Sequence, residues 1–87
     1  PDNSRPTGWM GLQYVSSDGA RSVLMAYRLG QSDMRHVFRL RGLAKGKTYQ
    51  VRMNGRPQGA FSAEHLAGTG LPVTLDAQWR AAVIELE

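Results

Sequence analysis

The sequence contains no cysteine, which excludes a disulfide framework, a thiolate metal site and a cysteine nucleophile. Its 87 residues have room for one domain with one hydrophobic core. We therefore expect packing alone, or packing together with a neighbouring surface, to hold the fold. No stretch reaches the roughly 18 consecutive apolar residues of a membrane-spanning helix, so the sequence predicts no membrane partner.

Apolar anchors are missing from the first eight residues, which hold two prolines and one glycine. Such a composition is typical of a linker or disordered arm, which we expect at 1–8, followed by the folded domain at 9–87. Because position 1 is Pro rather than Met, we expect a domain taken from a longer chain. A targeting signal would then lie upstream, which leaves both a cytoplasmic and a secreted location open.

Residues for catalysis are sparse. The aspartates at 18, 33 and 76 fall in expected turns, and the glutamates at 64, 85 and 87 lack the apolar surroundings that raise the pKa of a catalytic acid. His36 and His65 lie on different expected elements without a second ligand at metal spacing. No serine lies in a Gly-x-Ser-x-Gly turn, and no glycine-rich loop opens a long helix. The sequence therefore predicts no catalytic residue, no metal and no cofactor.

The chain is basic, with 11 Lys and Arg against 7 Asp and Glu and a net charge of +4, which raises nucleic acid as a partner. Most of the excess is arginine on or beside expected strands, where alternation turns every second side chain to solvent. The residues concerned are Arg28, Arg35, Arg39, Arg41 and Arg52. Because basic and aromatic residues are not densely interleaved, a solvated sheet face explains the charge better than a nucleic-acid surface.

Strand patterns fill most of the chain. Period-two alternation or dense apolar residues, bounded by turn residues, predict strands at 9–16, 21–28, 35–41, 48–53, 57–61, 71–75 and 81–86. Residues 62–68 predict one short helical turn, with Ser62 as N-cap and Gly68 as the left-handed terminator. About seven short strands with one helical turn predict an all-β fold, an antiparallel, Greek-key-like β-sandwich.

Three details sharpen this expectation. Asn54 and Gly55 form the strongest hairpin signal, because both central residues of a type I′ turn need positive φ. Pro57 predicts a short strand and suits a strand start or an edge, since it cannot donate to a ladder. The strand at 21–28 is apolar at nearly every position, which favours a strand that is covered on both faces or central in a sandwich.

The two tryptophans are the candidate contact residues. Trp9 stands at the start of the first expected strand, and Trp79 lies in the loop before the last one. Three interpretations stay open for them: contact with a neighbouring domain, a place in the core, or a platform for a sugar ring.

Several phrases occur in an order that points to a known family. They are Arg-Leu-Arg-Gly-Leu at 39–43, Thr-Tyr-Gln-Val at 48–51, the Ser-to-Leu run at 62–75 and Ala-Val-Ile-Glu-Leu at 82–86. In this order they resemble the C-terminal β-sandwich domain of α-galactosidases of glycoside hydrolase family 36, over about residues 9–87. Ala63 stands where that family usually has Gly, and Ala67 where Met is common.

This resemblance implies a three-part enzyme, in which a large β domain and a catalytic barrel precede the small sandwich packed on that barrel. The catalytic aspartates of the family lie in the barrel, so none is carried over to a residue here. The resemblance therefore implies a non-catalytic chain whose partner is the catalytic barrel of its parent. An interdomain contact of about 600–1,500 Å² would leave Trp9, Trp79 and several apolar strand residues exposed in the free domain.

Two other interpretations come from different classes. The phrase Leu-x-Gly-Leu followed by Tyr-x-Val also resembles fibronectin type III domains, in which a tyrosine makes a corner hydrogen bond, and would imply a spacer module. Against it, three strands are expected after the tyrosine strand rather than one. An autonomous carbohydrate-binding module would need two or more exposed aromatic side chains on one surface.

Overall fold

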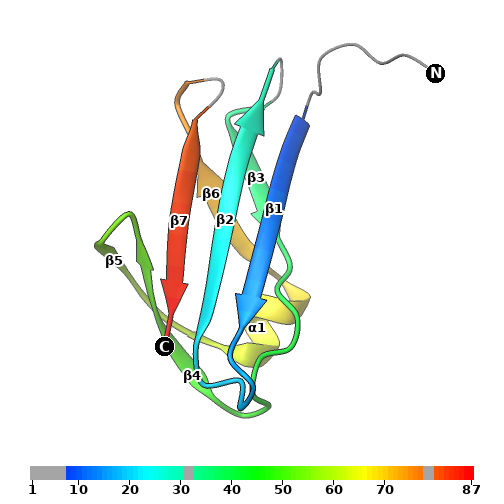
Figure 1. The fold of residues 1–87 in the computed structure, drawn as a ribbon, viewed down its shortest axis with the longest axis vertical. Coiled ribbons are helices and arrows are strands. Elements are labelled where there is room, and N and C mark those ends of the chain that lie inside the picture. Colours follow the sequence, from blue (N-terminus) through cyan, green and yellow to red (C-terminus); the bar gives the residue numbers. More distant parts are fainter. Residues whose placement is uncertain (1–7, 31–32, 78–79) are drawn as a thin grey trace, which may run out of the picture.

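We describe the fold from a computed structural model, which describes residues 8–30, 33–77 and 80–87. These residues form seven strands and one short helix (Figure 1). In chain order the elements are β1 (Gly8–Val15), β2 (Ser22–Leu29), β3 (Arg35–Phe38), β4 (Thr48–Met53), β5 (Arg56–Ser62), α1 (Ala63–Gly68), β6 (Leu71–Thr74) and β7 (Ala81–Leu86). The all-β fold class expected from the sequence is confirmed.

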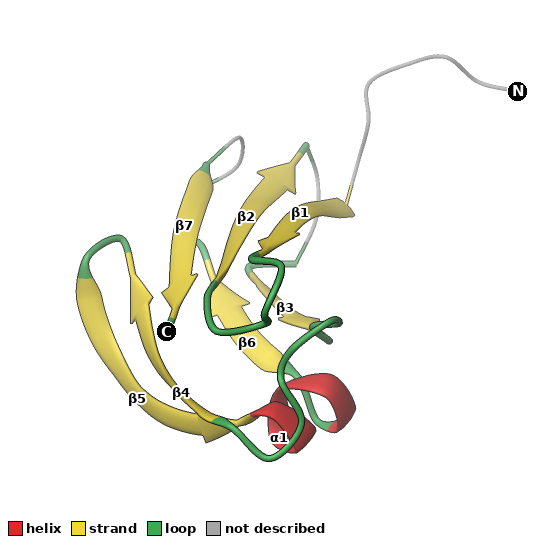
Figure 2. Ribbon diagram, turned by 60° about the horizontal axis from the view of Figure 1, so that its bottom comes forward, coloured by secondary structure: helices red, strands yellow, loops and turns green. Residues whose placement is uncertain are grey.

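The strands form two antiparallel sheets. The larger sheet has the order β1-β2-β7-β4-β5, and β3 pairs with β6 in a second, two-stranded sheet. Figure 2 shows the strongly curved β4–β5 hairpin, with α1 beside the end of β5 and the β3–β6 pair facing the larger sheet. β5 lies at an edge of the larger sheet, as expected from Pro57, and its register against β4 shifts between Val51 and Arg52.

The core lies between the two sheets, because alternation turns every second side chain of each strand inward. In β2 the burial pattern alternates strictly, so Leu24 and Ala26 point inward. Tyr49 is fully buried, and its hydroxyl donates to the carbonyl of Gly19 and accepts from the amide of Ala44. The buried hydrophobic residues are Leu24, Ala26, Leu40, Tyr49, Val51, Ala63, Leu66, Leu71, Val73, Leu75, Ala82, Ile84 and Leu86.

Two local predictions are confirmed at the residues that carried them. Asn54 and Gly55 have φ of 51° and 82°, as the type I′ turn requires. Ser62 caps α1, since its side chain accepts from the backbone N–H of His65 at 3.0 Å. Of the helices in the described part of the chain, none is long and apolar enough to cross a membrane.

Replacing Ser62 with alanine should lower the free energy of unfolding by about 1 kcal/mol, because the first turn of α1 loses its side-chain acceptor. Ser62→Asp is the matched control, since aspartate also caps helices and should keep most of the stability. Urea unfolding followed by circular dichroism measures both. Equal losses in the two variants would contradict a capping role.

The strand predicted at 35–41 was too long at its C-terminal end. β3 stops at Phe38, because the following backbone bonds to other elements. Leu40 donates its N–H to the carbonyl of Leu66 in α1, and Arg41 donates its N–H to the side-chain oxygen of Gln13. This segment therefore joins the helix to β1 instead of extending the small sheet.

Two further expectations were wrong. Gly68 does not end the helix in a left-handed conformation; Gly70, at φ +93°, makes that turn, and its N–H donates to the carbonyl of His65. Arg28 does not belong to a solvated face, because it shares the inward side of β2 and is only 7% exposed. Its guanidinium donates to the carbonyl of Leu75 at 3.0 Å.

Candidate functional site

The outer face of the larger sheet carries a continuous group of apolar side chains at the β1 edge. Cross-strand pairing places them side by side, since Met10 lies opposite Tyr27, Leu12 opposite Met25, and Met25 opposite Val83. We call this surface the apolar face. Its members are Met10, Leu12, Tyr14, Val23, Met25, Tyr27 and Val83.

The apolar face lies open to solvent, although its residue types are those of a core. Met10, Leu12, Tyr14 and Val83 are 45%, 44%, 61% and 41% exposed, and the outward side chains of β2 are half-buried. The expectation that β2 is covered on both faces is therefore met only on the inner side within this domain. Contiguous exposed apolar side chains rimmed by polar residues are typical of a surface that binds a partner.

Charge on the same outer surface begins at Glu85 of β7, which lies opposite Val23 of the apolar face. Glu85 of β7 lies opposite Arg52 of β4, and Arg52 pairs with Glu87 at 3.0 Å. Arg21 reaches the same carboxylate at 3.8 Å. An apolar centre bordered by exposed ion pairs is the usual composition of a protein–protein interface.

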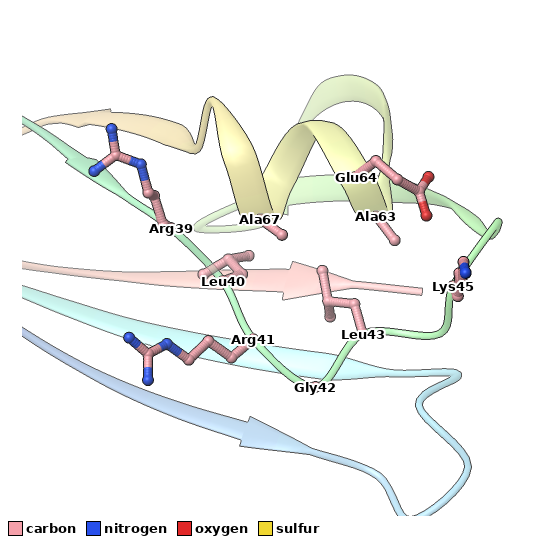
Figure 3. A pocket seen from close by; sticks show the side chains of 9 residues that line it. All are labelled: Arg39, Leu40, Arg41, Gly42, Leu43, Lys45, Ala63, Glu64 and Ala67. Atoms are coloured by element: carbon pink, nitrogen blue, oxygen red, sulfur yellow. The ribbon is translucent and has the colours of Figure 1, made fainter.

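A groove of about 480 Å³ lies between the 39–45 segment and helix α1. Figure 3 shows Leu40 and Leu43 facing Ala63 and Ala67 of the helix, with charged side chains at both ends. Its lining residues are Arg39, Leu40, Arg41, Gly42, Leu43, Lys45, Ala63, Glu64 and Ala67. The lining, all of it in the described part of the chain, contains no aromatic ring on which a sugar could stack.

Glu64 is the one carboxylate among these lining residues. The backbone N–H of Gly46 donates to its Oε2 at 3.0 Å, and this hydrogen bond lowers the pKa of Glu64 below its ordinary value of 4.5. The side chain is therefore an anion at neutral pH. A glycosidase acid needs a raised pKa and a second carboxylate nearby, and the lining residues of this groove supply neither.

The comparisons with known proteins agree with the order of motifs in the sequence. Residues 9–86 match the model of the glycosyl hydrolase family 36 C-terminal domain. The chain belongs to this family. No curated protein and no solved structure matches the chain.

In this glycosyl hydrolase family 36 C-terminal domain, Trp9 points to the inner side of β1, away from the apolar face. Its Nε1 donates to the carbonyl of Asp33 at 2.8 Å, and its ring stacks on His36 at 5.7 Å. Phe38 meets the same ring edge-on at 6.0 Å. Contact between Trp9 and a neighbouring domain or a sugar stays a prediction. Trp79 lies outside the described residues.

The two histidines of the family 36 domain lie in separate ring clusters. His36 stacks on Trp9, and His65 stacks on Phe61 at 5.6 Å. Among residues 8–30, 33–77 and 80–87, no group of three His, Asp or Glu side chains gathers as metal ligands. Each histidine ring packs against an aromatic neighbour.

The fibronectin interpretation is not favoured for this family 36 domain. Tyr49 does bond to the backbone five residues upstream, at Ala44, as a tyrosine corner would. However, β5, β6 and β7 all follow the tyrosine strand β4. The buried hydroxyl is therefore a feature the two folds share, and the number of following strands separates them.

The resemblance implied that several apolar strand residues are exposed in the free domain, but the sequence alone did not identify them as one face. Met10, Leu12 and Tyr14 alternate along β1, and β2 is apolar on both sides. The pattern of β2 predicted cover on both faces or a central place in a sandwich, and that of β1 predicted only a shared side. The structure shows that nothing among the described residues covers this side of the sheet, because the second sheet lies against the other.

Proposed function

We propose that this chain is the non-catalytic C-terminal domain of an α-galactosidase-like glycoside hydrolase, and that it packs on and supports the catalytic barrel of its parent enzyme. The match of residues 9–86 to a family defined as a C-terminal domain carries the proposal. Such a domain follows the rest of its enzyme in the chain, where the catalytic groups of the family are expected.

The carboxylates of the described residues support a role without catalysis. Glu64 is held as an anion by the Gly46 N–H. Asp18 accepts from the N–H of Ala20 and the hydroxyl of Ser16, and these bonds lower its pKa too. Both side chains stabilise turns, and neither is poised to protonate a leaving group.

A sugar-binding role has less support. Tyr14 is exposed and Tyr27 half-buried on the apolar face, but thioether and aliphatic side chains make up the rest of it. Carbohydrate sites combine aromatic rings with convergent polar groups that bond the sugar hydroxyls. The two phenols are the only polar groups among the seven side chains of the apolar face.

The test has one arm for catalysis and one for support. The 87-residue chain should hydrolyse p-nitrophenyl α-galactoside no faster than buffer, and a rate removed by Glu64→Gln would contradict the proposal. The parent enzyme without residues 9–87 should melt several degrees lower than the intact enzyme, because it loses an interdomain contact. Unchanged melting and unchanged activity after this deletion would show that the domain gives no support.

A further inference from the structure

We propose, building on the function proposed above, that the apolar face of β1, β2 and β7 is the surface on which the catalytic domain of the parent chain packs. Its partner would be an apolar, weakly charged surface of that domain. The geometry distinguishes this face from the other surfaces described below by residue type, by its place on the first strand and by the ion pairs on its β4 side.

The first observation is composition. Methionine and tyrosine are enriched at the centres of protein interfaces, whereas charged residues are depleted there. The apolar face has two methionines and two tyrosines, and one charged side chain, Glu85, borders it opposite Val23. Tyr14 is 61% exposed, the highest fraction among the exposed apolar residues of this face. Its side chain is suited to enter a pocket on the partner, as aromatic anchors do.

The second observation is connectivity. A C-terminal domain follows its catalytic domain in the chain, so the connection reaches this fold at its first strand. β1 begins at Gly8 and forms an edge of the larger sheet. The described chain therefore begins on the edge strand that carries Met10, Leu12 and Tyr14, at the opposite edge of the sheet from β5.

The third observation is the unprotected edge. β1 is eight residues long, and no described strand pairs with its second edge. Natural proteins protect long apolar edge strands with charged residues, proline or a covering element, because exposed edges promote aggregation. No residue from Trp9 to Val15 is charged or proline. Packing of another domain against β1 would supply the missing protection.

Other surfaces fit an apolar partner less well. The outer side of the β3–β6 sheet presents Arg35, Val37, Pro72 and Thr74, a small and mixed group. The groove beside α1 carries charged side chains at both ends (Figure 3). A smaller groove of about 260 Å³ on the β3–β6 side includes Arg35 in its lining.

Methionine oxidation in the intact parent enzyme tests the inference with a control inside the chain. Met10, on the apolar face, is 45% exposed in this domain, and Met34, just before β3, is 54% exposed. Peroxide oxidises methionines according to their access to solvent. Peptide mass spectrometry gives the rate for each residue, relative to the same residue in the urea-unfolded parent enzyme.

We expect oxidation of Met10 to be at least about tenfold slower than that of Met34 in the folded parent enzyme, since only Met10 would be covered. Equal rates at the two methionines, or slower oxidation of Met34, would overturn the inference. The oxidation rates would not decide the proposed function. The deletion experiment above tests whether the domain stabilises the parent enzyme, whichever face makes the contact.

A pair of substitutions provides a second measurement. Leu12→Glu puts a charge in the centre of the apolar face, and Thr74→Glu puts one on the exposed outer side of β6. Leu12→Glu should lower the thermal midpoint of the parent enzyme by several degrees, whereas Thr74→Glu should leave it within about 2 °C. Equal effects of the two substitutions would overturn the inference.

Discussion

Replacing Gly70 with alanine is expected to destabilise the domain by about 3 kcal/mol. Gly70 turns the chain from α1 into β6 at φ +93°, a conformation that disfavours any residue with a side chain. A Cβ at this position would lie 2.5 Å from Cγ1 of Val37 and 2.9 Å from the carbonyl oxygen of Phe38. The backbone oxygen cannot rotate away, so the small sheet would have to move.

Gly68→Ala is the matched control for this experiment. Gly68 lies in α1, two residues earlier, with no atom within 4 Å of an added Cβ and without a positive φ. Because alanine favours helices, this substitution should leave stability unchanged or raise it by about 0.5 kcal/mol. Urea unfolding of both variants measures the difference. Similar losses at the two positions would mean that the close approach to Val37 and Phe38 is not what constrains Gly70.

Replacing Tyr49 with phenylalanine is expected to lower the free energy of unfolding by about 2 kcal/mol, although only one oxygen is removed. That oxygen accepts from the N–H of Ala44 at 2.7 Å and donates to the carbonyl of Gly19. Both backbone groups would lose their partner inside the protein. The hydroxyl also joins the β1–β2 turn to the segment before β4, so its loss weakens a contact between distant parts of the chain.

Tyr14→Phe is the control for Tyr49→Phe. The Tyr14 side chain is 61% exposed, so water can bond its hydroxyl, and we expect a change within about 0.5 kcal/mol. Both variants lose the same hydroxyl oxygen, so the difference between their free energies of unfolding reports the two buried hydrogen bonds of Tyr49. Thermal and urea unfolding measure this difference. If Tyr49→Phe unfolds at the same urea concentration as the unaltered chain, the two backbone groups are satisfied in another way.

Local features were predictable because neighbouring residues determine them. The Asn54-Gly55 turn was predictable because both positions must adopt positive φ, which Asn and Gly tolerate. The Ser62 cap was predictable because its hydroxyl lies three residues before a backbone N–H that has no partner within the helix. The strand at 81–86 was also predicted with its observed bounds, because alternation marks it clearly. These signals lie within a few residues of the structure they specify.

Features that depend on distant residues were not predictable in the same way. β3 ends early because Leu40 and Arg41 find partners in α1 and β1, about 26 to 28 residues away in sequence. Arg28 was assigned to solvent by its charge, although its parity within β2 places it with Leu24 and Ala26 on the inner side. Its acceptor, the carbonyl of Leu75, is 47 residues away.

For the apolar face too, the sequence pattern predicted the residues but not their distant contacts. Alternation predicted that Met10, Leu12 and Tyr14 share one side of a strand, and pairing with β2 confirms it. Whether that side is covered depends on where the second sheet packs, which one strand's pattern does not determine. The sequence therefore contained the residues of the site but not their exposure.

The position of β7 has a consequence for how the domain is made. β7 is the last strand in sequence, yet it lies inside the sheet, between β2 and β4. During synthesis the β1–β2 and β4–β5 hairpins can each pair as they emerge, but no strand ladder joins them until residues 81–86 have left the ribosome. A chain stopped by a premature termination codon before residue 81 would hold two hairpins with unpaired inner edges, the type of species that chaperones and proteases recognise.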